Sequence, residues 1–355
     1  MQSYLKEDIA CLANMTDIMY AYAGKTILVT GATGLIGSVI VKALCAYEQS
    51  TNTGLRVLAV ARNPHKVSQI FAEEENYACF GAVICDVNES ISVEEHIDYI
   101  IHGASVTSSK MFVAQPVDTI TTLIQGTKNL LDLGKQHNIT QMLYLSSLEV
   151  YGVPEPEVCN VAEAYVGYID FTAVRSSYSE GKRMAECLCN CYSSQYGVPV
   201  VTARLTQTFG PGVDYNDGRV FAQFARCAIN GENITLNTAG RTYRSYCYLR
   251  DAVAAILCIL ARGESMQAYN VANKNTGITI ADMAKLICEK ESLGAGKIQV
   301  VFNNPDNLAS LGYNPEMKIA LNTEKLEALG WRAEVDLEQM FIRMIHDMKL
   351  QKNEN

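Results

Sequence analysis

The stretch Thr26-Ile-Leu-Val-Thr-Gly31-Ala-Thr-Gly34-Leu-Ile-Gly37 joins a short apolar run to a glycine-rich turn. Its first five residues are typical of a buried β-strand, and the last glycines open a helical pattern. Gly31 allows a tight turn, Gly34 lets the backbone approach a pyrophosphate, and Gly37 lets the helix pack on a sheet. This order of features predicts a dinucleotide-binding site. The cofactor-binding residues expected here are Gly31, Gly34, Leu35, Ile36 and Gly37.

Outward from this stretch, β-branched runs alternate with longer amphipathic segments. The expected strands are Thr26–Thr30, Arg56–Ala61, Ala82–Cys85, Tyr99–His102, Met142–Ser146 and Val198–Arg204. The expected helices include Leu35–Tyr47, Val117–Gln136 and Tyr178–Tyr196. The alternation predicts an α/β fold, a Rossmann-type doubly wound parallel sheet covered by helices on both faces.

The alternation stops after about residue 205, where Gly210-Pro-Gly212 begins a loop-rich region. We expect a helical extension over residues 1–23 and a dinucleotide-binding domain over 24–205. Residues 206–355 are expected to form mainly a smaller α+β lobe that binds the substrate. The segment near 268–272 is expected to return to the main sheet.

The end of the second strand bears on cofactor choice. Enzymes that bind NAD usually carry an acidic residue there for the adenosine ribose. This chain has Val60-Ala61-Arg62-Asn63 instead, and Arg62 could pair with a 2′-phosphate or be an ordinary surface arginine. We expect NADP to be the preferred cofactor, with NAD as the alternative. Asp86, followed by Val87 after the third strand, could meet the adenine amino group.

Composition narrows the classes of partner. The chain has 355 residues, of which 48% are hydrophobic and 19% charged, and a formal net charge of −9. The negative charge argues against nucleic acid and anionic membranes as general partners. Twelve cysteines without a CxxC pair predict reduced thiols and no metal site. No signal peptide and no membrane-spanning stretch is recognisable, so we expect a cytoplasmic protein.

Tyr178 and Lys182 stand four residues apart in Tyr178-Ser-Glu-Gly-Lys-Arg183, on one face of a predicted helix. A lysine ammonium beside a phenol favours the phenolate, so the tyrosine could act as an acid or base near neutral pH. The spacing alone is weak evidence, but the pair is expected one strand and one helix after Ser146-Ser147-Leu148-Glu149-Val-Tyr-Gly152.

With these residues the chain resembles the extended short-chain dehydrogenase/reductase family, whose members modify nucleotide sugars. The resemblance covers about residues 24–348. Its further motifs are Ile101-His-Gly103-Ala104-Ser105, Phe209-Gly-Pro211, Arg244 before Tyr248-Leu-Arg-Asp251, Tyr269-Asn-Val-Ala272 and Leu329-Gly-Trp331. Within the family, Tyr178–Arg183 and Asn216-Asp-Gly-Arg219-Val220 look most like the UDP-glucuronate decarboxylases.

The resemblance implies specific roles. Tyr178 exchanges the proton of a sugar hydroxyl, usually at C4, while the nicotinamide exchanges a hydride. Ser147 bonds the same oxygen, and Lys182 holds the nicotinamide ribose. Arg219 and Arg244 are the candidates to hold the substrate diphosphate, and Gly103, Ala104 and Ser105 are expected to contact the cofactor. Relatives of this type imply a homodimer.

Several positions depart from family patterns. Gln207 stands where an asparagine usually helps to bind the sugar nucleotide, and Leu123 also replaces an asparagine. Leu148 stands where 4,6-dehydratases place the acid that protonates the departing hydroxyl, whereas Glu149 keeps the position of the base at C5. A decarboxylase, a 4-epimerase, a 4,6-dehydratase and an NADPH-dependent keto-sugar reductase therefore all stay open. So does a nucleotide-binding protein without catalysis.

Overall fold

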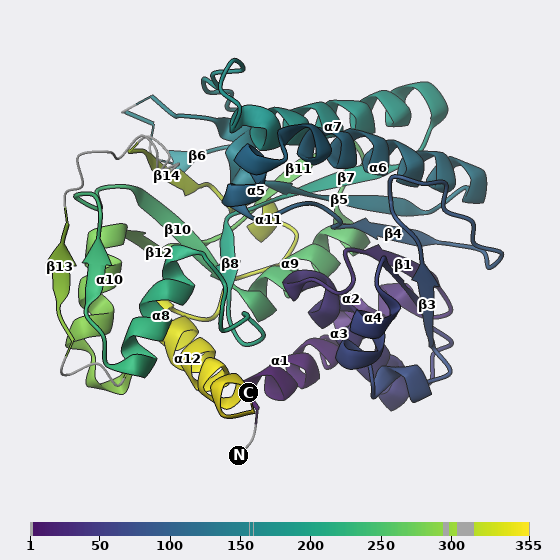
Figure 1. Ribbon diagram of the computed structural model, residues 1–355. Helices are drawn as coiled ribbons and strands as arrows, with labels where there is room; N and C mark the ends of the chain where they lie inside the picture. Colours follow the sequence, from purple (N-terminus) through teal and green to yellow (C-terminus); the bar gives the residue numbers. More distant parts are fainter. Residues whose placement is uncertain (1–2, 156, 159, 294–297, 304–315, 355) are drawn as a thin grey trace.

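The computed structural model describes residues 3–155, 157–158, 160–293, 298–303 and 316–354. A seven-stranded sheet forms its centre (Figure 1). The strands of this sheet are β1 (Thr26–Thr30), β2 (Arg56–Ala61), β3 (Phe80–Ile84), β4 (Tyr99–His102), β5 (Gln141–Ser147), β7 (Val200–Leu205) and β11 (Ala268–Val271). Their order is β11-β7-β5-β4-β1-β2-β3, and every neighbouring pair is parallel. The predicted Rossmann-type fold is confirmed.

Helices cover both faces of this sheet because apolar side chains of its strands point alternately to either side. One face packs against α3 (Leu35–Thr51) and α9 (Leu249–Arg262), and α1 (Tyr4–Ala13) and α2 (Thr16–Met19) pack in turn on these helices. The other face packs against α6 (Pro116–His137) and α7 (Ser176–Tyr196), as Figure 1 shows. Shorter helices of this half are η1 (Tyr20–Tyr22), α4 (Pro64–Ile70), η2 (Glu74–Asn76), α5 (Ser109–Ala114) and η3 (Leu148–Tyr151).

The expected element bounds are close to the observed ones. The third strand starts two residues earlier than expected, because Phe80 pairs with Val57 of β2. The strand expected from Val198 begins at Val200, after a proline that has no N–H for the ladder. The helix expected from Tyr178 begins at Ser176.

A second group of elements lies beside the main sheet. Its strands are β6 (Asn160–Val161), β8 (Gln207–Phe209), β9 (Ile234–Leu236), β10 (Tyr243–Tyr248), β12 (Asn273–Thr279), β13 (Val300–Phe302) and β14 (Lys318–Leu321). Five of them form a mixed sheet ordered β12-β10-β14-β6, with β8 also paired to β10, and β9 pairs with β13. The helices are α8 (Val220–Asn230), α10 (Ile280–Glu289), η4 (Glu291–Leu293), α11 (Glu324–Glu327) and α12 (Leu337–Glu354). Apolar residues of α8, α10 and α12 form a core of their own.

A single residue, Thr206, separates β7 of the main sheet from β8 of the second sheet, because β7 ends at Leu205 and β8 begins at Gln207. Its backbone N–H donates to the carbonyl of Val271 in β11, with an N–O distance of 3.0 Å. Its hydroxyl donates to the carbonyl of Ser245 in β10 at 2.6 Å. Thr206 is therefore bound to both sheets.

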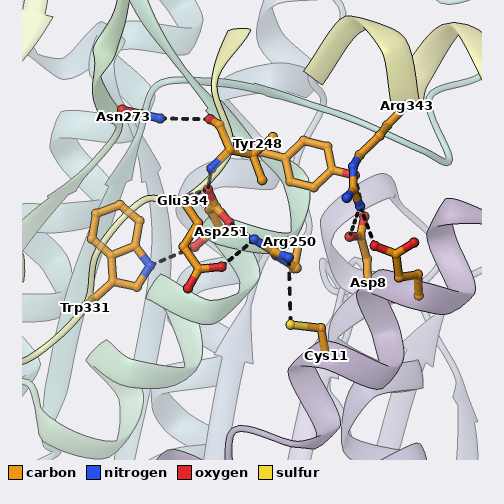
Figure 2. Close-up of polar contacts among 11 residues, drawn as sticks. Asp8, Cys11, Tyr248, Arg250, Asp251, Asn273, Trp331, Glu334 and Arg343 are labelled. Atoms are coloured by element: carbon orange, nitrogen blue, oxygen red, sulfur yellow. Dashed lines mark hydrogen bonds and ion pairs between the residues drawn. The ribbon is translucent and has the colours of Figure 1, made fainter. Parts of the chain in front are cut away.

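The N-terminal helix α1 is held by a buried carboxyl group. Asp8 is 2% exposed and accepts hydrogen bonds from the Tyr248 hydroxyl at 2.5 Å and from the Arg343 guanidinium at 3.2 Å (Figure 2). Burial raises the pKa of Asp8 to about 6, although the Tyr248 hydrogen bond and the charges of Arg250 and Arg343 oppose the shift. These contacts connect α1 to both β10 and α12.

Candidate active site

A cavity of about 830 Å³ runs along the carboxyl ends of the strands in the main sheet. This is where open α/β sheets bind their ligands. Every site residue predicted from the sequence lines it: Gly31, Gly34, Leu35, Ile36, Gly37, Arg62, Asp86, Val87, Gly103, Ala104, Ser105, Ser147, Glu149, Tyr178, Lys182, Gln207, Arg219 and Arg244. The structure brings these residues together, while their individual roles stay predictions.

The glycine-rich turn fits a pyrophosphate. Gly31 has a φ of +67°, and a Cβ there would lie 2.8 Å from the backbone of Gly103, so a larger residue is excluded. Gly34 caps α3 without any side-chain hydrogen bond. The first N–H groups of α3 therefore have no partner from a capping side chain and face the cavity, as an anion-binding helix start requires.

At the end of the cavity where β2 and β3 finish, the positive charge of the lining side chains is only weakly compensated. The Arg62 side chain is 77% exposed, and its guanidinium lies 3.7 Å from the Asp86 carboxylate. Lys66 lines the same region. Asp86 also accepts a hydrogen bond from the backbone N–H of Asn88 at 2.9 Å. This end of the cavity therefore offers two cations and one carboxylate, which is already engaged.

Lys182 and Tyr178 are both buried, with exposed fractions of 3% and 9%. Lys182 Nζ donates to the Leu145 carbonyl at 2.6 Å and lies 5.8 Å from the centre of the Tyr178 ring. Burial lowers the pKa of Lys182 to about 7, because the charged ammonium is poorly solvated.

The pKa of Tyr178 shifts in the opposite direction from our expectation. Burial raises it, the negative charge of Glu149 adds to the increase, and a hydrogen bond with Ser147 opposes it. The expectation that Lys182 stabilises the phenolate is not met in this geometry, because the Lys182 ammonium is directed to the Leu145 carbonyl. The buried site therefore favours the neutral phenol, which donates a proton, over the phenolate, which accepts one.

An aromatic ring that sequence reasoning missed lies on Tyr178. Phe112 of α5 stacks on the Tyr178 ring with 4.2 Å between centroids and an angle of 8° between planes. Ser177 of α7 donates a hydrogen bond to the Phe112 carbonyl at 3.1 Å, which fixes α5 to α7. Nothing in the spacing of Phe112 signals this contact, since it depends on how α5 meets α7.

Glu149 is engaged in a largely buried ion pair that sequence reasoning also missed. Arg175 donates from both terminal nitrogens to the two carboxylate oxygens of Glu149, each at 2.9 Å, and Ser179 adds a bond of 3.0 Å. Burial alone raises the pKa of Glu149, but Arg175, with help from Arg244 and Ser179, outweighs it and holds that pKa below its usual value. These contacts therefore favour the carboxylate form of Glu149.

The residue before Glu149 is not an acid. Leu148 is 5% exposed and packs in an apolar cluster with Val150, Tyr151, Ile319 and Leu321. This position therefore carries no side chain that can donate a proton.

The two arginines expected at the substrate diphosphate differ in their surroundings. Arg219 forms a two-pronged ion pair with Asp217, the shortest distance being 2.6 Å. Arg244 pairs with no carboxylate among the described residues, its buried Nε has no hydrogen-bond partner there, and Nη2 lies 3.7 Å from the Met317 sulfur. Arg244 is thus better prepared than Arg219 to receive an anion. Gln207 lies in β8, directly beside β10.

In the part of the chain that the structure describes, no helix is long and apolar enough to cross a bilayer. Among the same residues, no three His, Cys, Asp or Glu side chains gather where they could hold a metal ion.

Comparisons with known proteins agree with this geometry. The model of the NAD-dependent epimerase/dehydratase family matches residues 27–272. UDP-glucuronic acid decarboxylase 6 of Arabidopsis thaliana is 32% identical over 327 residues, which are 91% of this chain and 89% of that protein.

Solved structures with the same fold include UDP-glucose 4-epimerase from Thermotoga maritima with UDP-glucose, at a TM-score of 0.74 and 21% identity, covering 92% of this chain and 99% of that one. UDP-glucuronic acid 4-epimerase from Bacillus cereus in complex with NAD has a TM-score of 0.72 and 19% identity, covering 92% and 99%. The chain belongs to the NAD-dependent epimerase/dehydratase family.

Proposed function

We propose that the protein decarboxylates a nucleotide-linked uronic acid, with UDP-glucuronate as the first substrate to test. The observation that carries the proposal is the pair of positions after Ser147. Leu148 is buried among apolar side chains, and Glu149 is held as a carboxylate by Arg175. Neither can protonate a departing hydroxyl, so the site supports oxidation at C4 without the loss of water.

The residues suit such a sequence of steps. In its phenolate form, Tyr178 takes the proton of the C4 hydroxyl. A bound nicotinamide would supply the chemistry of accepting and returning a hydride at C4. The resulting ketone is β to the C6 carboxylate, so the C5–C6 bond breaks with loss of carbon dioxide, and the enolate that remains takes a proton from solvent at C5. Tyr178 then returns its proton to the C4 oxygen. Its raised pKa favours this return, because a neutral phenol is the stable form of the buried side chain.

Arg244 supports an anionic substrate. Its guanidinium has no carboxylate partner among the described residues and lines the cavity near Glu149. A diphosphate accepting hydrogen bonds from Arg244 would satisfy the buried Nε.

For the cofactor, we infer a preference for NADP over NAD. Arg62 and Lys66 are cations at the adenosine end, and β2 is not followed by a carboxylate that could bond the ribose hydroxyls. The same observation favours a second candidate function, the NADPH-dependent reduction of a keto-sugar nucleotide.

The deciding experiment incubates the purified protein with UDP-glucuronate and, separately, with dTDP-glucose, and follows the products by mass spectrometry and NMR. We expect carbon dioxide to be lost from UDP-glucuronate and no water to be lost from dTDP-glucose. A change of C4 configuration without a change of mass would identify an epimerase instead. Consumption of NADPH with a 4-keto sugar would identify the reductase, and rapid dehydration of dTDP-glucose would refute the argument from Leu148.

A further inference from the structure

The ion pair between Arg175 and Glu149 lies outside the set of residues that the sequence points to. Glu149 is placed by η3 at the end of β5, and Arg175 is the residue that precedes the first turn of α7. Their side chains are only 20% and 22% exposed. The contact is bidentate, which fixes the plane of the carboxylate as well as its position.

The position of Arg175 is electrostatically unfavourable for the helix itself. A cation at a helix N-terminus meets the positive end of the helix dipole, and α7 gains nothing from it. Within the described residues, Arg175 makes a single ion pair, that with Glu149. Its guanidinium also lies 5.7 Å from the ring centre of Phe112, which in turn stacks on Tyr178. Arg175 therefore contacts two of the groups that surround the reacting phenol.

We propose that Arg175 is a positioning residue, whose guanidinium keeps the Glu149 carboxylate charged and fixed in orientation beside Tyr178. Glu149 then acts as a fixed negative charge and not as a base that moves a proton at carbon. Hydride departure leaves C4 electron-poor, and a nearby fixed carboxylate favours that departure. The catalytic consequence rests on the proposed function, whereas the state of Glu149 does not.

All charged and titratable groups around Glu149 enter this balance. Arg175, Ser179 and Tyr178 face it from α7, and Arg244 faces it from β10. Burial disfavours the carboxylate, and Arg175 is the largest of the opposing influences. Removal of the guanidinium leaves burial opposed only by Arg244 and one hydroxyl, so the pKa of Glu149 must rise.

The first test needs no substrate. Infrared difference spectra recorded across a pH series follow the carboxyl band of Glu149, which is assigned by its loss in Glu149→Gln. We expect Arg175→Met to raise the apparent pKa by about one unit or more, that is, to make the carboxyl at least about tenfold easier to protonate. In Arg175→Lys, which keeps the positive charge, the apparent pKa of Glu149 should stay closer to that of the wild type. An unchanged Glu149 titration in Arg175→Met overturns the proposal.

A milder variant protects the test against misfolding. Ser179→Ala removes one hydrogen bond from Glu149 and leaves the ion pair, so its apparent pKa should rise by less than in Arg175→Met. If Arg175→Met does not fold, the apparent pKa of Glu149 in Arg175→Lys and in Ser179→Ala should still be higher than in the wild type. Three identical titrations overturn the proposal.

The second test uses turnover. With UDP-glucuronate, the acid limb of kcat/KM against pH should move upward in Arg175→Met by the same interval as the infrared titration. In the Arg175→Met, Glu149→Gln double variant, this movement should vanish. If the pH profile of kcat/KM in Arg175→Met has a lower maximum but the same shape as in the wild type, Arg175 has a merely structural role. If the wild-type protein turns over no uronic acid, the proposed function fails, while the infrared titrations still decide the assignment of Arg175.

Discussion

Arg244→Met should weaken UDP binding much more than Arg219→Met, although both arginines line the same cavity. Arg244 has no carboxylate partner among the described residues and a buried Nε without a hydrogen bond, so an incoming diphosphate gains contacts there without breaking others. A hydrogen bond to a charged group contributes about 1.5–3 kcal/mol, so its loss should raise Kd about 10- to 150-fold. Arg219 is already paired with Asp217 and is 37% exposed, so its removal should cost about fivefold or less.

Isothermal titration calorimetry of UDP measures both variants directly. Arg241→Met provides the matched control, because Arg241 is 74% exposed, lies outside this cavity and pairs with Glu316. UDP binding to the control should equal that to the wild type. The reasoning is refuted if Arg219→Met loses as much affinity as Arg244→Met, or if Arg244→Met binds UDP normally.

Four other variants test three separate parts of the structure. Arg62→Ala should raise the Kd of NADP about tenfold and leave that of NAD unchanged, because one charge-assisted contact to the 2′-phosphate is lost. Fluorescence titration with both cofactors measures the two Kd values. Tighter binding of NAD than of NADP by the wild type would contradict the assignment of Arg62. Tyr178→Phe should abolish turnover and keep cofactor affinity, whereas Lys182→Ala should lower both; substantial turnover in Tyr178→Phe rules out its assignment. Asp8 has a pKa of about 6 in the fold and about 3.9 in unfolded chains, so its ionisation destabilises the native state. The free energy of unfolding should therefore fall as pH rises from about 4 to above 6, by an amount on the order of 2–3 kcal/mol, and Asp8→Asn should remove this decrease. Urea denaturation across that range tests the point, and equal pH dependence in the two proteins refutes it.

The parts of the site that could be predicted from sequence are those encoded over short spans. Gly31, Gly34 and Gly37 follow a strand directly, and Tyr178 and Lys182 are separated by one helical turn. Local spacing is enough to place such residues together, because the backbone geometry of a turn or helix is fixed. The fold class followed from the same kind of regularity.

What the sequence did not reveal depends on contacts between distant segments. Glu149 and Arg175 are 26 residues apart, and their pairing is decided by how η3 meets α7. The cation at the start of a helix is the one local signal that could have indicated a special role for Arg175. The environment of Lys182 was also misjudged, since its partner is a backbone carbonyl in β5, which no side-chain pattern records.

The single-residue connection at Thr206 limits how the molecule can open. Lobes that move apart usually do so about a flexible linker, but Thr206 is bonded to β11 on one side and to β10 on the other. The two sheets should therefore behave as one rigid body, and a sugar nucleotide has to enter past the rim of the cavity. The short helix α5 lines this cavity and carries Phe112, whose ring stacks on that of Tyr178, so an incoming sugar meets the aromatic ring of α5 where it meets the phenol.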